Sequence, residues 1–138
     1  MADLEFVVYS GEYDRKEFYS HMGKYFAEDQ YKRQLPYLKN QDGKVWFVAF
    51  GGGEVAAFSS LQEKKNKIVF SSGYVEERYR KSGVWEQMIK LRLDYVSGSD
   101  KPIEIATDKD YLVATLKKYQ FNMVRETKNY TFMERVDE

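Results

Sequence analysis

The sequence contains no cysteine and only one histidine, His21. The absence of cysteine excludes disulfide bonds, thiolate metal sites and a cysteinyl acyl intermediate. One histidine is also too few for a histidine metal site and leaves little for a Ser-His-Asp triad. His21 has Phe18, Met22 and Tyr25 around it in a predicted helix, so we interpret it as structural or solvated rather than catalytic. The chemistry must then rest mainly on backbone amides, carboxylates, lysines and phenols, and we expect no metal.

The chain also lacks a long apolar run and an excess of charge of one sign. No window approaches the roughly 20 apolar residues of a membrane-spanning helix, and residues 1–8 lack the basic flank and apolar run of a secretory signal. Lys+Arg and Asp+Glu both number 22 in 138 residues, so the broad positive surface of a nucleic-acid-binding protein is not expected. We predict one cytoplasmic domain over 1–138, with no membrane partner and no nucleic-acid partner.

The order of the predicted elements indicates an α/β fold with a central mixed sheet flanked by helices. Alternation and β-branched or aromatic runs predict strands at 4–9, 45–50, 54–61, 67–75 and 101–107, with two more within 121–136. Helical spacing predicts a helical region from the capping residue Asp14 to Pro36, and helices at 84–98 and 110–119. Gln41–Lys44 and Gly51–Gly53 are turn signals. Three consecutive strands imply an antiparallel meander, followed by a parallel crossover at 67–107.

The loop between the strand at 67–75 and the helix at 84–98 carries the most specific chemical signal. The first turn of a helix has amide N–H groups without internal partners, and the helix dipole adds partial positive charge there. A loop with Arg80, Lys81, Ser82 and Gly83 can wrap such amides around a pyrophosphate. Gly83 would let the backbone approach closely, and the two basic residues would supply charge.

At this loop the chain resembles the GNAT superfamily of N-acetyltransferases. Their acetyl-coenzyme A loop reads Q/R-x-x-G-x-G/A after a strand that ends in Val, and here Arg80–Trp85 follows Val75 at the usual distance. A second match is Ile105–Asp108 followed by Leu116–Phe121, similar to the strand and the "LEKYGF" helix end of that family. The resemblance covers essentially the whole chain and implies the GNAT acyl-CoA N-acyltransferase fold.

The sequence departs from the family pattern at five positions. Trp85 stands where the loop usually ends in a small residue, so it either crowds the first helical turn or packs under the loop. Glu77 replaces a proline and Lys109 an asparagine. Leu116 replaces the tyrosine that serves many relatives as general acid, and Gln120 replaces a glycine.

The resemblance implies direct transfer of the acetyl group of acetyl-CoA to an amine, without a covalent enzyme intermediate. The residues it assigns to the cofactor are Tyr74, Val75, Arg80, Lys81, Ser82, Gly83, Val84, Trp85, Asp108 and Lys109. It also implies that an amide near Tyr74 or Val75 stabilises the developing oxyanion.

The attacking amine must lose a proton, so a base or a water chain is needed. Glu76 and Glu77 are the first candidates, and the alternative is that each is a solvated carboxylate paired with Arg78 or Arg80. Tyr111 or Tyr119 is the candidate proton donor in place of Leu116. Because the chain has 12 tyrosines, core packing is the alternative role for Tyr119.

The leading hypothesis is an N-acetyltransferase that acts on a small-molecule or protein amine. The alternatives are a catalytically inactive GNAT-fold binding or regulatory module and, third, a nucleobase-modifying enzyme of this fold. The aromatic residues of 18–37 either line the acceptor site or form core. A homodimer is also possible, in which an exposed strand near the C terminus pairs with a second copy of the chain.

Overall fold

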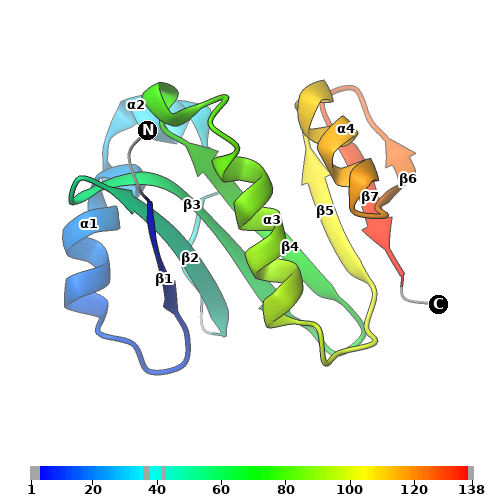
Figure 1. The fold of residues 1–138 in the computed structure, drawn as a ribbon, viewed down its shortest axis with the longest axis horizontal. Helices are drawn as coiled ribbons and strands as arrows, with labels where there is room; N and C mark the ends of the chain where they lie inside the picture. The colour runs from blue at the N-terminus through cyan, green and yellow to red at the C-terminus, as the bar shows by residue number, and fades with distance from the viewer. Residues whose placement is uncertain (1–3, 36–37, 42, 137–138) are drawn as a thin grey trace.

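The computed structural model describes residues 4–35, 38–41 and 43–136 and contains one seven-stranded mixed sheet (Figure 1). The strand order is β1-β2-β3-β4-β5-β7-β6. The strands are β1 (Glu5–Tyr9), β2 (Lys44–Gly51), β3 (Glu54–Glu63), β4 (Ile68–Val75), β5 (Ile103–Thr107), β6 (Asn122–Glu126) and β7 (Thr131–Arg135). The helices are α1 (Arg15–Ala27), α2 (Asp29–Gln34), α3 (Val84–Tyr95) and α4 (Asp110–Lys118), with a 3-10 turn η1 (Glu77–Tyr79). The predicted α/β element order is confirmed.

Local sequence signals place several of these boundaries. The Asp14 side chain accepts a hydrogen bond from the Glu17 amide at 3.1 Å and caps α1 as predicted. Gly52 and Gly53 have φ of 61° and 83°, which allows the tight turn between β2 and β3. The predicted helix stop at Pro36 and the Asp42 of the first turn signal lie outside the described residues.

The first helical region is broken into two helices at Glu28. This residue is extended, with φ −82° and ψ 135°, and its amide donates to the Lys24 carbonyl. The same residue then stands at the N-cap position of α2. The break turns the chain so that both Tyr25 of α1 and Tyr31 of α2 are buried against the same strands.

The sheet consists of two antiparallel parts that meet at a short parallel seam. β1 to β4 pair antiparallel in sequence order, and β5, β7 and β6 form the second antiparallel part. β4 and β5 pair in parallel only from Ile68↔Ile103 to Phe70↔Ile105. Beyond these pairs the two strands separate toward their carboxyl ends, as Figure 1 shows.

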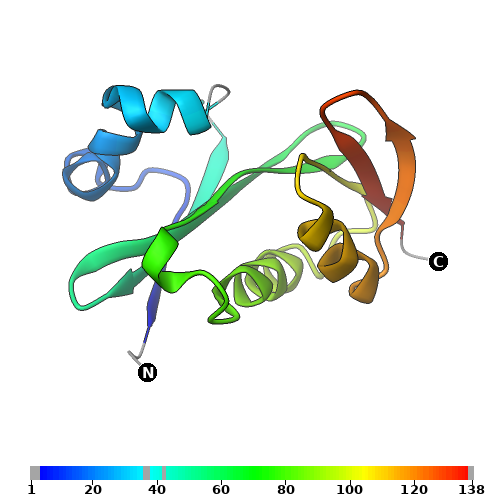
Figure 2. The ribbon, with the colours of Figure 1, turned by 90° about the horizontal axis from the view of Figure 1, so that it is seen from above.

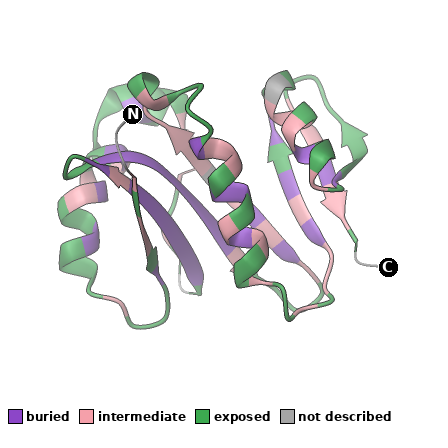
Figure 3. Cartoon of the chain, viewed as in Figure 1, coloured by how far each residue is buried: buried purple, intermediate pink, exposed green. Residues whose placement is uncertain are grey.

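The helices cover both faces of the sheet (Figure 2). α1 and α2 pack on one face over an aromatic cluster that includes Trp46 and Phe58. α3 and α4 pack on the other face, where Phe70 and Met88 are buried. Burial is concentrated on the central strands β2 and β3 (Figure 3). No helix in these ranges is both long and apolar enough to cross a membrane.

The buried face of α3 differs from the predicted apolar stripe. In the helix predicted at 84–98, helical spacing puts Val84, Met88 and Tyr95 on one apolar stripe. The Tyr95 side chain is nevertheless 49% exposed. Arg92 is fully buried instead, one turn after Met88. The helix itself is confirmed, and it ends at Tyr95, before the predicted end near residue 98.

Candidate functional site

The carboxyl ends of β4 and β5 and the N-terminus of α3 meet at one edge of the sheet. Because the two strands are parallel and stop pairing after Phe70↔Ile105, the backbones of residues 71–75 and 106–107 diverge and are not paired with each other (Figure 1). Gly83 is the N-cap of α3 and has φ 83°, a conformation that favours glycine. The first backbone bond of the helix runs from the Gln87 amide to the Gly83 carbonyl at 3.1 Å. The amides of residues 84–86 therefore have no partner within the helix.

The three residues before Gly83 do not all behave as predicted. The Arg80 side chain turns back on β4: its Nε donates to the Val75 carbonyl at 2.9 Å, and its guanidinium lies 5.7 Å from the centroid of the Tyr74 ring. Lys81 is exposed and has φ 66°, and the Ser82 hydroxyl donates to the Tyr79 carbonyl. These bonds engage Arg80 and Ser82 within the protein, so the exposed Lys81 and the backbone amides are the remaining candidates for contact with an anion.

Trp85 packs against the strand at Gly73. A Cβ built on Gly73 would lie 2.4 Å from Cζ3 and 2.6 Å from Cη2 of Trp85, so only glycine leaves room for this indole. Of the two predicted placements, crowding of the first turn or packing beneath the loop, the second is the one found. The Trp85 Nε1 is buried and has no hydrogen-bond partner among the described residues.

Arg92 lies two turns further along α3 and is buried beside the same indole. Its guanidinium lies 4.5 Å from the Phe70 ring centroid and 5.5 Å from that of Trp85. Two long hydrogen bonds of 3.4 Å run to the carbonyls of Met88 and Ser60. Burial lowers the pKa of Arg92 to about 9, so the group remains a cation at neutral pH. Periodicity alone gave no reason to place a charged residue here.

Asp108 and Lys109 stand at the end of β5, opposite the end of β4. Both are exposed, and Lys109 Nζ lies 3.7 Å from Asp108 Oδ2. The Lys109 amide donates to the Thr107 hydroxyl at 3.2 Å, which fixes the turn into α4. The parallel seam thus brings these two residues to the same sheet edge as Tyr74 and Val75, as the family resemblance requires.

Tyr119 lies on a link between α3 and α4, away from the two candidate bases. Its hydroxyl donates to Glu86 Oε1 at 2.8 Å, and Lys118 Nζ binds the same oxygen at 2.9 Å. Burial, followed by this bond to Glu86, raises the pKa of Tyr119. Leu116, at the usual position of the family's tyrosine, is fully buried core. Gln120 adopts φ 70°, so the backbone keeps the shape that the family's glycine provides.

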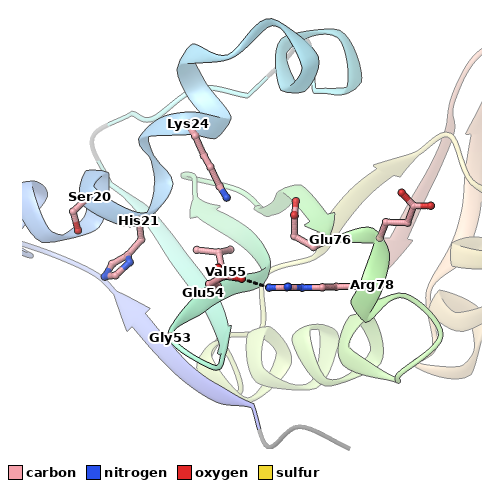
Figure 4. A pocket seen from close by; sticks show the side chains of 9 residues that line it. Ser20, His21, Lys24, Gly53, Glu54, Val55, Glu76 and Arg78 are labelled. Carbon is pink, nitrogen blue, oxygen red and sulfur yellow. Dashed lines mark hydrogen bonds and ion pairs between the residues drawn. The ribbon is translucent and has the colours of Figure 1, made fainter.

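A cavity of about 510 Å³ lies on the α1 side of the sheet and contains both candidate bases (Figure 4). It is formed by α1, the β2–β3 turn and the end of β4. Its lining residues are Ser20, His21, Lys24, Gly53, Glu54, Val55, Glu76, Glu77 and Arg78. Sequence analysis identified Glu76 and Glu77, but it could not place residues 20–24 and 53–55 beside them because the three segments are distant in the chain.

Glu76 faces a group of phenols from three elements. The Tyr31 hydroxyl donates to Glu76 Oε1 at 3.4 Å. Burial and then the charge of Glu76 raise the pKa of Tyr25 and of Tyr31, and the same two causes raise the pKa of Tyr74. These phenols therefore stay protonated, and the Tyr31 hydroxyl is the one that donates to the carboxylate. Glu76 has no ion pair with Arg78 or Arg80, contrary to the solvated-pair alternative.

Most of the described aromatic side chains of the first helical region belong to the core and none of them lines the cavity, while Tyr19 is 39% exposed. Phe18, Tyr25 and Tyr31 are buried in the cluster under α1 and α2, and Tyr37 lies outside the described residues. His21 is 37% exposed, lies 3.3 Å from Glu17 Oε1 and packs its ring on Phe50. In the described ranges, no group of His, Cys, Asp or Glu has the arrangement of a metal site.

Comparison with known proteins gives a match in structure only. Neither the family models nor the curated protein sequences match this chain. An acyl-CoA N-acyltransferase from Pseudomonas aeruginosa aligns with a TM-score of 0.77 at 17% identity, over 97% of this chain and 100% of that one. A PaiA N-acetyltransferase from Thermoplasma acidophilum, solved with coenzyme A, aligns with a TM-score of 0.67 at 13% identity, covering 98% and 99% of the two chains.

A GNAT family acetyltransferase from Elizabethkingia anophelis, solved with acetyl-CoA bound, aligns with a TM-score of 0.65 at 9% identity. The alignment covers 97% of this chain and 98% of that one. All three alignments extend over nearly the full length of this chain. The chain therefore has the GNAT acyl-CoA N-acyltransferase fold.

Proposed function

We propose that this protein is an N-acetyltransferase that moves the acetyl group of acetyl-CoA directly to an amine. The observation that carries the proposal is the junction of two sites at the end of β4. On one side are the opening between β4 and β5 and the free amides of α3. On the other side is a cavity that contains Glu76. A donor and an acceptor bound in these two places would meet at the end of one strand.

The residues present fit the phosphate end of coenzyme A. Gly83 caps α3 in a left-handed conformation, and a Cβ on it would meet no atom within 4 Å, so the space in front of the helix is open. The amides of residues 84–86 and the α3 dipole favour an anion there. Lys81, exposed beside them, would add charge. The pantetheine would lie along β4 toward the cavity, with Asp108 and Lys109 across the opening.

Glu76 is the residue that we assign to proton removal. A neutral amine attacks the thioester carbonyl, its nitrogen loses a proton to Glu76, and the thiolate leaves. The thiol has a pKa near 8.5, so its departure needs little acid assistance, which suits a chain with leucine at position 116. Holding amine and thioester together can supply about 7–11 kcal/mol of the barrier reduction in well-aligned cases.

The first test measures thermal unfolding with acetyl-CoA and with free coenzyme A. A ligand at 100 times its dissociation constant should add about 2.7 kcal/mol, which is a shift of several degrees for a chain of this size. Gly83→Asp should abolish the shift because it puts a negative side chain at the anion site. Gly11→Asp is the matched control, because Gly11 also has positive φ and open space around it but lies in the β1–α1 loop.

The second test measures turnover with a panel of amines by the release of free thiol. The chain has no cysteine, so a thiol reagent detects only the coenzyme A that is produced. Glu76→Gln should lower kcat about 100-fold or more, as for loss of a general base, whereas Glu77→Gln should stay within a few-fold. Cofactor binding without turnover on any amine would favour the non-catalytic module, and equal losses for both variants would overturn the assignment of Glu76.

A further inference from the structure

Some of the charged side chains that line the cavity form ion pairs within the protein and others do not. Arg78 and Glu54 form an ion pair with each other, drawn as the dashed line in Figure 4. Their charges therefore cancel at the rim of the cavity. Lys24 and Glu76 belong to no ion pair in the described parts of the chain. Among the described residues that line the cavity, Lys24 is therefore the lysine outside any ion pair, and Glu76 and Glu77 are the two carboxylates outside one.

Lys24 is an exposed residue whose side chain points toward this space (Figure 4). It lies on α1, one turn after Ser20 and His21, which line the same cavity. Its Nζ is 5.2 Å from the centroid of the Tyr25 ring, and the side chain points from the helix into the space that Glu76 enters from β4 (Figure 4). Its charge also contributes to lowering the pKa of Glu54, after the larger effect of Arg78.

Lys24 and Glu76 project from opposite walls of the cavity, and this arrangement of charge selects among amine acceptors. A simple amine or polyamine would bring only positive charge toward Lys24, and like charges repel. A lysine side chain in a peptide carries no carboxylate of its own for Lys24. A molecule with both an ammonium group and a carboxylate would satisfy both walls, and a cavity of about 510 Å³ is within the size range of small-molecule sites.

We propose that the acceptor is a small amino carboxylate, whose carboxylate binds Lys24 while its amine is held at Glu76. This inference rests on the proposed function, since it names the acceptor class for the same reaction. Lys24 acts here as a specificity residue: it touches the substrate but takes no part in the proton transfer. The binding step orients the amine by fixing the other end of the molecule.

The test compares matched pairs of acceptors that differ only in the carboxylate, such as phenylalanine with phenethylamine and lysine with cadaverine. For each pair, the ratio of kcat/KM for the amino acid to that for the amine is measured by thiol release. The ratio is then compared between wild type and Lys24→Met, so intrinsic differences in amine reactivity cancel. Lys16→Met is the control, because Lys16 is an exposed residue of the same helix that does not line the cavity.

We expect wild type to prefer the amino acid, and Lys24→Met to reduce the ratio about tenfold, the effect of losing one charge-assisted contact. Lys24→Glu should reverse the preference, and Lys16→Met should leave the ratio unchanged. A ratio that is the same in wild type and Lys24→Met, or a wild type that prefers the amines, overturns the inference while acetyl transfer stands. Failure to bind acetyl-CoA and to turn over any acceptor instead overturns the proposed function, and this inference with it.

Discussion

The contact between Gly73 and Trp85 offers a direct test of how this chain accommodates a large residue at the end of the loop that precedes α3. Gly73→Ala adds a Cβ that would lie 2.4 Å from Cζ3 and 2.6 Å from Cη2 of the indole. Relief requires a movement of about 1 Å, since carbon atoms in contact prefer about 3.5–4.0 Å. Beneath the indole lies the buried guanidinium of Arg92, so the ring cannot move freely. Overpacking of this kind costs about 2–3 kcal/mol.

The expected result is a fall in Tm on the order of 8 °C, measured by thermal unfolding followed by far-UV circular dichroism. Urea unfolding followed by the same signal measures the change in the free energy of unfolding. In a Trp85→Leu background the ring is absent, so Gly73→Ala should be neutral or slightly stabilising, because alanine restricts the unfolded chain. The double-mutant cycle should then give a coupling of about 2 kcal/mol, well above the roughly 0.5 kcal/mol expected of independent sites. Equal costs in both backgrounds would refute the packing of Trp85 on Gly73.

Three further predictions concern charged side chains. Arg92→Met should leave the free energy of unfolding unchanged or raise it by up to about 2 kcal/mol, because the buried cation has no carboxylate partner among the described residues. A fall in the free energy of unfolding of more than about 2 kcal/mol, measured by urea unfolding, would contradict this. Burial lowers the pKa of Lys44 to about 8 from 10.5, so between these pH values the unfolded chain binds more protons and stability rises with pH. Lys44→Met should remove that rise when unfolding is compared at pH 7, 9 and 10, and an unchanged slope would contradict the shift. Glu86→Gln should leave Tm almost unchanged, because its bridge to Lys118 is partly exposed, and a clear fall in Tm would show that the link orders both helices.

Much of the fold follows from local signals that act over a few residues. The glycines at 52 and 53 specify a turn because their positive φ suits few other residues, and the Asp14 cap starts α1 where the sequence predicts it. The loop at 80–85 was also predictable as the segment that leads into α3, since its residues are contiguous and a helix begins at its end; its role in cofactor binding stays a prediction. The conformation of Gln120 could be anticipated only through the resemblance, which places a glycine there.

Other features depend on tertiary contacts that no sequence window contains. The break at Glu28 carries no proline or glycine signal and arises because both flanking helices bury an aromatic residue on the same strands. Periodicity placed Val84 and Met88 on the buried face of α3 correctly, but it gave no reason to bury Arg92. Arg80 was expected to face a phosphate, but a nearby carbonyl captures its Nε. The cavity joins residues of α1 to the end of β4, and Lys24 gave no signal of its own.

The short seam between β4 and β5 has a mechanical consequence. Among the described residues, three pairs join β4 of the first antiparallel part to β5 of the second. The sheet is therefore least stiff between these two strands. Amides on either side should exchange with solvent sooner than those of β2 and β3, whose pairing is continuous over most of their length. A molecule wedged between the separated ends would brace the two parts against each other. The rigidity of the whole protein would then depend on whether a molecule is bound between the separated strand ends. The rate of hydrogen exchange at residues 68–70 would report this change in rigidity.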